Sequence, residues 1–212
     1  METKTKTMQE INLPADIARD LLTGAAIAAH SDSALPGINA IALSVAGGEL
    51  RIAATDRFRL LAGSLAYDDD SALMDQILIP LDGAKRIIST LKALPKRLII
   101  KPTLTLTRAG DILTAAINAG LDNSSTITIS LNARGEREFP PYDHLFPADS
   151  VPMAGLSFNP ALLADFAKVP NNLAKGSQLM VTLHGETKPI SLTIPHDKIQ
   201  WRGLLMPMRV KA

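Results

Sequence analysis

The sequence contains no cysteine, which excludes disulfide bonds and zinc sites with cysteine ligands. Aromatic residues make up only 4% of the chain, while hydrophobic residues together reach 46%. The core must therefore be built mainly from Leu, Ile, Val and Ala. Neither sign of charge dominates, because 22 Lys and Arg stand against 21 Asp and Glu. Any contact with a polyanion has to come from a local patch of charge.

Long apolar runs are also missing. No run approaches the ~18 residues that a membrane-spanning helix needs. The first ten residues, METKTKTMQE, lack the apolar segment of a secretory signal. The length of 212 residues suits one large domain or two small ones. We therefore expect a globular protein of the cytoplasm.

Residue patterns typical of catalysis are absent as well. The four histidines lie far apart, without the spacing of metal ligands. The acidic run at 68–70 is typical of a solvated turn rather than a cation site. No glycine-rich phosphate loop precedes a helix, and no motif for a serine or cysteine nucleophile occurs. The sequence predicts no enzyme activity, no metal site and no cofactor.

The sequence does contain an internal repeat, which occurs three times. An apolar strand leads through a proline into an amphipathic run at Ile11–Leu22, Ile77–Leu91 and Leu156–Ala167. Proline suits the first helical turn, where its fixed φ fits and its missing N–H is not needed. Segments of alternating polarity follow each run, and glycine-containing turns separate them. The pattern predicts an α+β fold made of three strand–helix–three-strand repeats.

Such a repeat cannot bury all of its apolar surface alone. In the second copy, Ile87, Ile88, Leu91 and Leu94 form an apolar helix stripe. One repeat would also expose an apolar sheet face, so two repeats should pair into one domain. Three repeats make one and a half domains, and we expect the last half, from Met153 to Met208, to need a partner.

Four motifs give the repeats a family resemblance. They are AATDRFRLLAGSL, EFPPYDHLFP at Glu138–Pro147, FNPALLADFAKV, and LLMPMRV near the end. In this order the chain, from about Ile11 onward, resembles the bacterial sliding clamp, the beta subunit of DNA polymerase III. Residues 8–147 resemble the complete middle domain of the family, and residues 148–212 resemble the second half of its last domain. The resemblance therefore implies a shortened clamp of one and a half clamp domains.

The resemblance also implies a hydrophobic groove that binds short linear peptides of polymerases and other replication proteins. Arg57 and Phe58 stand where the family has a glycine and a histidine, and His144 stands where a basic residue is usual. Without the other motifs, the Met-Pro-Met segment would be interpreted as an ordinary buried strand end. By motif matching the groove residues are Thr55, Arg57, Arg59, Leu60, Pro140, Leu145, Asn159, Leu162, Leu204, Met206, Pro207, Met208 and Arg209.

In family clamps the helices line a pore and contact DNA phosphates without reading the bases. The resemblance therefore implies that Lys85, Arg86 and Lys92 face double-stranded DNA, although the plain alternative is a solvated helix face. Leu81 and Asp82 replace the basic pair that is common in the family at this helix start. Family rings contain twelve repeats, so we expect a homo-tetramer of three-repeat chains rather than a dimer. A clamp loader is a further partner that the resemblance implies.

The leading hypothesis is a sliding-clamp-like processivity factor that encircles DNA and tethers a DNA polymerase. A reduced clamp of this kind is consistent with a phage gene expressed in the cytoplasm of a bacterial host. The alternative hypothesis is a clamp-like adaptor or decoy, which binds the same peptides without encircling DNA. Ring closure distinguishes the two hypotheses.

Overall fold

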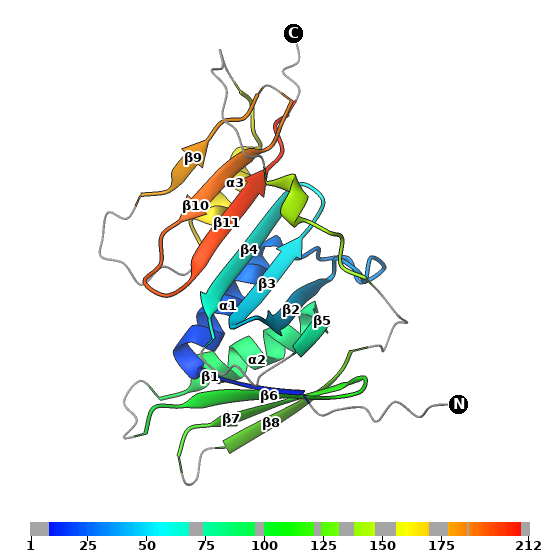
Figure 1. Cartoon of the computed structure of the whole chain (residues 1–212), viewed down its shortest axis with the longest axis vertical. Coiled ribbons are helices and arrows are strands. Elements are labelled where there is room, and N and C mark those ends of the chain that lie inside the picture. The colour runs from blue at the N-terminus through cyan, green and yellow to red at the C-terminus, as the bar shows by residue number, and fades with distance from the viewer. Residues whose placement is uncertain are drawn as a thin grey trace.

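The structure is a computed structural model of the chain, and its elements are shown in Figure 1. The residues that it describes are 9–67, 74–95, 100–120, 124–131, 138–146, 156–169, 178–185 and 187–208. These residues form two β-sheets, with α-helices packed against them. The α+β class predicted from the sequence is confirmed by this architecture.

The first two repeats follow the predicted order of one strand, one helix and three strands. The first repeat consists of β1 (Gln9–Pro14), α1 (Ala15–Ala28), β2 (Ala40–Ala46), β3 (Glu49–Thr55) and β4 (Arg59–Ala66). The second consists of β5 (Met74–Pro80), α2 (Leu81–Ala93), β6 (Thr103–Ala109), β7 (Ile112–Asn118) and β8 (Ser124–Ser130).

The third repeat differs at its start. It contains α3 (Pro160–Phe166), β9 (Met180–Thr182), β10 (Ile190–Ile194) and β11 (Gln200–Leu205). The segment before α3, expected to be a strand, forms only an isolated antiparallel bridge between Ser157 and Met208 within the described residues. A short 3-10 helix, η1 (Asp143–Leu145), lies in the connection that precedes this repeat.

The first two repeats exchange their leading strands. One sheet has the strand order β1-β6-β7-β8, so β1 of the first repeat lies at the edge of the second repeat's strands. The other sheet has the order β5-β2-β3-β4-β11-β10-β9, which begins with β5 of the second repeat. All neighbouring strands in both sheets are antiparallel. The exchange connects the first two repeats through both sheets.

The helices bury the apolar faces that their sequences predict. Helices α1 and α2 pack against each other and against the sheets, and Ile87, Ile88 and Leu91 on α2 are buried. Helix α3 lies behind β10 and β11, on the same side of the seven-stranded sheet as α1 (Figure 1). No helix in the described part of the chain is long and apolar enough to cross a membrane.

The third repeat joins the first by continuing its sheet, because β11 pairs with β4 over its whole length. Trp201 of β11 is fully buried at this joint, opposite Gly63 of β4. A Cβ atom on Gly63 or on Gly24 of α1 would lie 2.6 Å from the indole ring. The two glycines therefore provide the space for the only tryptophan of the chain.

Candidate functional site

A connecting segment crosses the face of the seven-stranded sheet that carries no helix. Phe139 is buried there in a small apolar cluster with Leu60 of β4 and Leu204 of β11, which lie directly opposite each other. Tyr142 packs edge-on against Phe139, with ring centroids 5.8 Å apart. Burial raises the pKa of the Tyr142 phenol. This cluster fixes residues 138–146 above the junction of the first and third repeats.

A cavity of about 560 Å³ lies beside this segment. It brings together five of the thirteen groove residues predicted from the sequence, which are Thr55, Arg57, Leu60, Pro140 and Leu145. The opposite wall is a loop that the sequence analysis did not identify, running from Ala34 to Ile38. Glu138 and Tyr142 complete the lining, which is mainly apolar with a few polar groups. This composition is typical of a site for a small ligand or an extended peptide.

The tight turn between β3 and β4 shapes one side of the cavity. The Asp56 carboxylate accepts hydrogen bonds from the backbone N–H groups of Phe58 and Arg59, at 3.1 and 2.9 Å. The Thr55 hydroxyl donates to the Arg59 carbonyl at 2.8 Å. Arg57 has a φ of 77°, in the left-handed region that favours glycine. The turn therefore holds Arg57 at the cavity in a conformation that costs its backbone energy.

Arg59 lies at the same turn, but its side chain has another role. Its guanidinium donates to Asp56 at 2.9 Å and also forms an ion pair with Asp165 of α3. The side chain is only 12% exposed. Hydrogen bonds from Lys168 and Arg59 lower the pKa of the Asp165 carboxyl. Arg59 thus connects the turn to the third repeat rather than lining the 560 Å³ cavity.

The Met206–Met208 segment continues β11 past the cavity. Met206 donates its backbone N–H to the Phe58 carbonyl at 3.2 Å, and Met208 donates to Ser157 at 2.7 Å. The side chains of Met206 and Met208 are 45% and 53% exposed, and Phe58 is exposed beside them. Phe58, Met206 and Met208 therefore form exposed apolar surface where β11 ends, beside the turn that carries Arg57.

Two further predicted groove residues, Asn159 and Leu162, have structural contacts. Asn159 caps α3, because its side-chain oxygen accepts the Ala161 N–H at 3.0 Å. Leu162 packs against the core and is half-buried, and Pro207 is half-buried. Arg209 lies outside the described residues.

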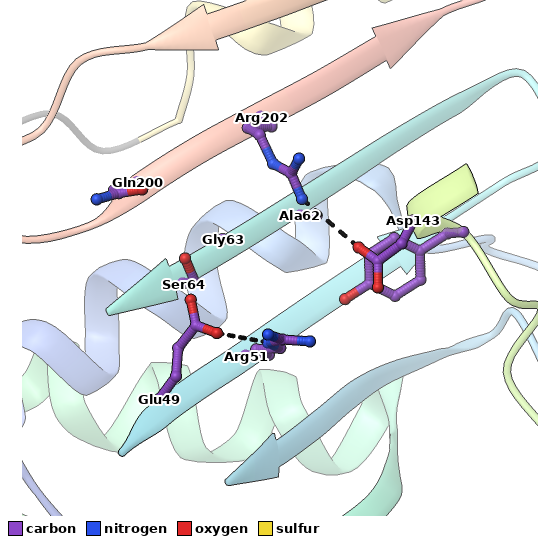
Figure 2. Close-up of a pocket in the computed structure, with 9 residues that line it drawn as sticks. Glu49, Arg51, Ala62, Gly63, Ser64, Asp143, Gln200 and Arg202 are labelled. Carbon is purple, nitrogen blue, oxygen red and sulfur yellow. Dashed lines mark hydrogen bonds and ion pairs between the residues drawn. The ribbon is translucent and has the colours of Figure 1, made fainter. Parts of the chain in front are cut away.

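A second, polar pocket lies on the same sheet face and is shown in Figure 2. Within it Arg51 donates to Glu49 at 2.6 Å, and this contact lowers the pKa of the glutamate. Arg202 of β11 pairs with Asp143 of η1 at 3.5 Å, and its guanidinium carbon lies 4.3 Å from the centre of the Phe146 ring. Arg202 therefore connects the third repeat to the segment that carries Pro140 and Leu145.

The basic residues predicted to face DNA lie together on one side of α2. Lys85, Arg86 and Lys92 are all exposed there. A cavity of about 490 Å³ between the start of α1 and the end of α2 includes Lys92, together with Arg19 and Lys101. Arg19 and Lys101 could not be predicted from the sequence as part of this surface, because they come from different segments and only the folded chain places them beside Lys92.

No group of three or more His, Asp or Glu side chains in the described part of the chain is arranged to hold a metal ion. The buried His196 ring accepts the backbone N–H groups of Lys198 and Ile199 at 3.0 and 3.1 Å, so it shapes the turn between β10 and β11.

Comparison with solved structures identifies the fold as that of bacterial sliding clamps. The chain resembles the DNA polymerase III beta subunit of Thermotoga maritima, with a TM-score of 0.75 and 15% identity over 100% of this chain and 68% of that one. It also resembles the DNA polymerase sliding clamp of Bacillus subtilis, with a TM-score of 0.73 and 15% identity over 100% of this chain and 66% of that one.

A third example is the DNA polymerase III subunit beta of Pseudomonas aeruginosa. Its TM-score is 0.74, with 16% identity over 99% of this chain and 69% of that one. This chain therefore spans about two thirds of the length of these clamps, as expected for a shortened clamp. No protein-family model matches the chain. At these identities the likeness establishes the fold, and function has to be argued from the sites.

Proposed function

We propose that this protein is a clamp-like processivity factor, which holds a DNA polymerase on its template without catalysing a reaction itself. The observation that carries the proposal is that the whole chain matches 68% of a sliding clamp in fold, combined with an apolar cavity at the junction of the first and third repeats. Domain boundaries at 8–147 and 148–212 are part of the same proposal. The proposal also places the protein in the cytoplasm, which contains the replicating DNA of a bacterium or of a phage that infects it.

The cavity and the Met206–Met208 segment form the peptide-binding groove of this proposal. Leu60 provides an apolar floor, and Pro140 and Leu145 provide the wall made by the connecting segment. Methionine side chains are flexible and polarisable, so Met206 and Met208 can adapt to different apolar anchors. Arg57 and Glu138 supply the polar groups that would fix the direction of a bound peptide. The partners are short linear segments of polymerases and other replication proteins.

The exposed basic face of α2 is the DNA-facing surface of the proposal. Contacts from Lys85, Arg86 and Lys92 would be to phosphates and independent of sequence. Arg19 and Lys101 extend this surface across the neighbouring helix start. In the proposed assembly four chains of three repeats form a ring, and a clamp loader opens it.

Titration calorimetry with a synthetic peptide tests the groove. We expect a peptide with glutamine, leucines and an aromatic residue to bind with a Kd in the micromolar range. Met206→Ala and Leu60→Ala should each weaken binding by about 1–2 kcal/mol, as expected for central apolar anchors. Ile112→Ala is the control, because Ile112 is an exposed apolar residue on β7, in the other sheet and away from the cavity. Unchanged affinity after truncation behind Leu205 would refute the groove.

Retention on DNA tests the clamp function. A closed ring should remain on a nicked circular plasmid during gel filtration and leave the plasmid after linearisation. The adaptor or decoy hypothesis predicts peptide binding with no difference between circular and linear DNA. The observation that favours this second hypothesis is that β9 ends the seven-stranded sheet without a further strand among the described residues. A single chain is therefore an open arc, and encirclement requires contacts between copies.

A further inference from the structure

We propose that the third repeat joins a second copy of the chain by reciprocal strand exchange. In this dimer, residues 156–159 of each copy pair with β9 of the other copy. The inference goes beyond DNA tethering and does not depend on it. It rests on the way in which the first two repeats complete each other.

In the complete domain, the strand before each helix pairs with the first strand after the other helix. Strand β1 pairs with β6, and β5 pairs with β2. In both strand pairs, the opposed residues that face the core are apolar, and each is at most 4% exposed. These pairs are Ile11 with Leu106, Leu13 with Leu104, Ile77 with Leu43, and Ile79 with Ile41.

The third repeat has both halves of this arrangement but not the pairing. Strand β9 is the last strand of its sheet and pairs only with β10 among the described residues. Residues 156–159 precede α3 in the way that β1 precedes α1, yet they form only the bridge from Ser157 to Met208. In a strand, the N–H and C=O groups of one residue point to one edge and those of the next residue point to the other edge. Because the carbonyl of Ser157 accepts the N–H of Met208, the backbone groups of Leu156 and Phe158 point away from Met208. That edge is suitable for pairing with another strand.

Apolar side chains on and beside β9 are exposed, although β9 has a core-facing side. Val181 lies opposite Leu192, which is fully buried, so the two side chains share the core face of the sheet. Val181 is nevertheless 46% exposed, and the neighbouring Leu179 and Met180 are exposed as well. An exposed apolar edge strand is a site where another strand adds.

The register of the proposed pairing follows from the turns after β2, β6 and β9, which are the first strands after the three helices. Gly47, Gly110 and Gly185 all have positive φ and follow these strands. The residues six positions earlier are Ile41, Leu104 and Leu179, and the first two of these are core-facing partners in the exchange.

The starts of the three helices align residues 156–159 with β1 and β5, which are the strands before α1 and α2. Pro14, Pro80 and Asn159 are the residues that immediately precede the three helices. By this equivalence Phe158 lies opposite Leu179, Leu156 lies opposite Val181, and Ser157 lies opposite Met180. The two core-facing pairs are apolar, as they are in the complete domain.

The occupant is a second copy because one chain carries both complementary parts. A two-fold axis between copies would form both strand pairs at once, since an isologous interface requires a single self-complementary surface. Leu162 and Leu163 of α3 are half-buried in the single chain and would pack across the same axis, as α1 packs with α2. An added strand from an unrelated protein would leave residues 156–159 without the matching edge.

Cross-linking between two single-cysteine variants tests the register, because the natural sequence has no cysteine. Ser157→Cys chains are mixed with Met180→Cys chains and oxidised, so that a disulfide can form only between the two kinds of chain at this pair. Directly opposed residues of antiparallel strands have Cα atoms roughly 4.5–5.5 Å apart, within the range that a disulfide bond spans. Ser157→Cys mixed with Thr182→Cys is the matched control, two residues out of register. Faster cross-linking in the control mixture would overturn the proposal.

Light scattering with a charge on β9 tests the interface itself. We expect the natural chain at micromolar concentration to have at least twice the 22.6 kDa mass of one chain. Val181→Lys should reduce the mass to that of a monomer, or halve it if the assembly is larger, while Trp201 fluorescence remains native. Ile112→Lys is the control, because Ile112 is similarly exposed, at 41%, but lies in the other sheet. A monomeric natural chain, or a Val181→Lys variant with unchanged mass, would overturn the inference.

These measurements separate the interface from the proposed function. A dimer that forms with the predicted register but fails to stay on circular DNA would support the strand exchange and contradict the clamp. Peptide binding and DNA retention without any contact through β9 would do the reverse.

Discussion

The guanidinium of Arg59 forms an ion pair with the carboxylate of Asp165, which lies 106 residues further along the chain. Arg59 begins β4 in the first repeat, and Asp165 lies on α3 in the third. Asp56 accepts a second hydrogen bond from the same guanidinium. A planar group with several donors in fixed directions can serve both carboxylates at once. The contact therefore couples the turn beside the candidate groove to the third repeat.

Removal of this contact should loosen the joint. We expect Arg59→Ala to lower the free energy of unfolding by about 1–3 kcal/mol, because the variant removes two charge-assisted hydrogen bonds at a mostly buried position. Urea unfolding followed by Trp201 fluorescence measures the change. Arg51→Ala is the control, since its exposed pair with Glu49 should contribute ~0.5 kcal/mol or less. Equal effects of the two variants would contradict the special role of Arg59.

The pH dependence of stability should report Asp165. Its pKa is below the ordinary value of 3.8 because Lys168 and Arg59 donate hydrogen bonds to it. A group with a lowered pKa in the folded chain contributes stability that is complete above its unfolded pKa. The contribution is lost as the pH falls from about 3.8 through the folded pKa. We expect unfolding titrations to show a smaller acid loss for Asp165→Asn than for the natural chain, and parallel curves would contradict this.

The repeats and their helices were predictable because their signals are local. The spacing of Ile87, Ile88 and Leu91 defines a helix face, and alternation with glycine turns defines the strands. Gly47 and Gly110 have the positive φ that such turns require. The motifs then predicted the clamp fold, which is confirmed. The site residues and domain boundaries remain predictions.

Long-range contacts were beyond the reach of the sequence. The motif that contains Arg59 gave no sign that its side chain turns to Asp165, because the partner comes from another repeat. Leu35 and its neighbours line the cavity only because the connecting segment folds back over the sheet. The exchange of β1 and β5 likewise depends on packing between repeats. The single tryptophan could have drawn attention to the joint, but its two glycine neighbours could not be identified from spacing.

The glycines around Trp201 offer a direct test of the joint. Gly63→Ala would place a Cβ atom 2.6 Å from the Trp201 ring, so the ring or the strand must shift. We expect a loss of about 1–3 kcal/mol in the free energy of unfolding, together with a change in the emission of Trp201. The double variant Gly63→Ala/Trp201→Leu should lose less than the sum of the two single losses, because the smaller side chain relieves the clash. Strict additivity in unfolding titrations would contradict the packing.

Arg57 gives a test of backbone strain at the candidate groove. Its φ of 77° is costly for a side chain with a Cβ atom, by roughly 1–2 kcal/mol. We expect Arg57→Gly to be as stable as the natural chain or more stable, because relief of this strain opposes the greater freedom of glycine in the unfolded chain. Arg57→Ala is the matched control, since it removes the guanidinium and keeps the Cβ atom. Thermal unfolding that ranks Arg57→Ala above Arg57→Gly would contradict the strain.

The basic face of α2 can be tested by the salt dependence of DNA binding. If Lys85, Arg86 and Lys92 each contact a phosphate, replacement of all three by alanine removes three released counterions. The slope of log K against log salt should then become less steep by about 3 units, since each contact contributes roughly 0.9. Fluorescence anisotropy with double-stranded DNA of any sequence measures the slope.

The control for the DNA test is Arg51→Ala, because Arg51 lies on β3 in the polar pocket of the helix-free sheet face (Figure 2). That variant should leave the slope unchanged, since its guanidinium points away from the proposed DNA path and already pairs with Glu49. Peptide affinity measured by calorimetry should be the same in all these variants, because none of the four residues lines the groove. A slope that changes with Arg51 and not with the α2 residues would move the DNA contact to the opposite face of the molecule.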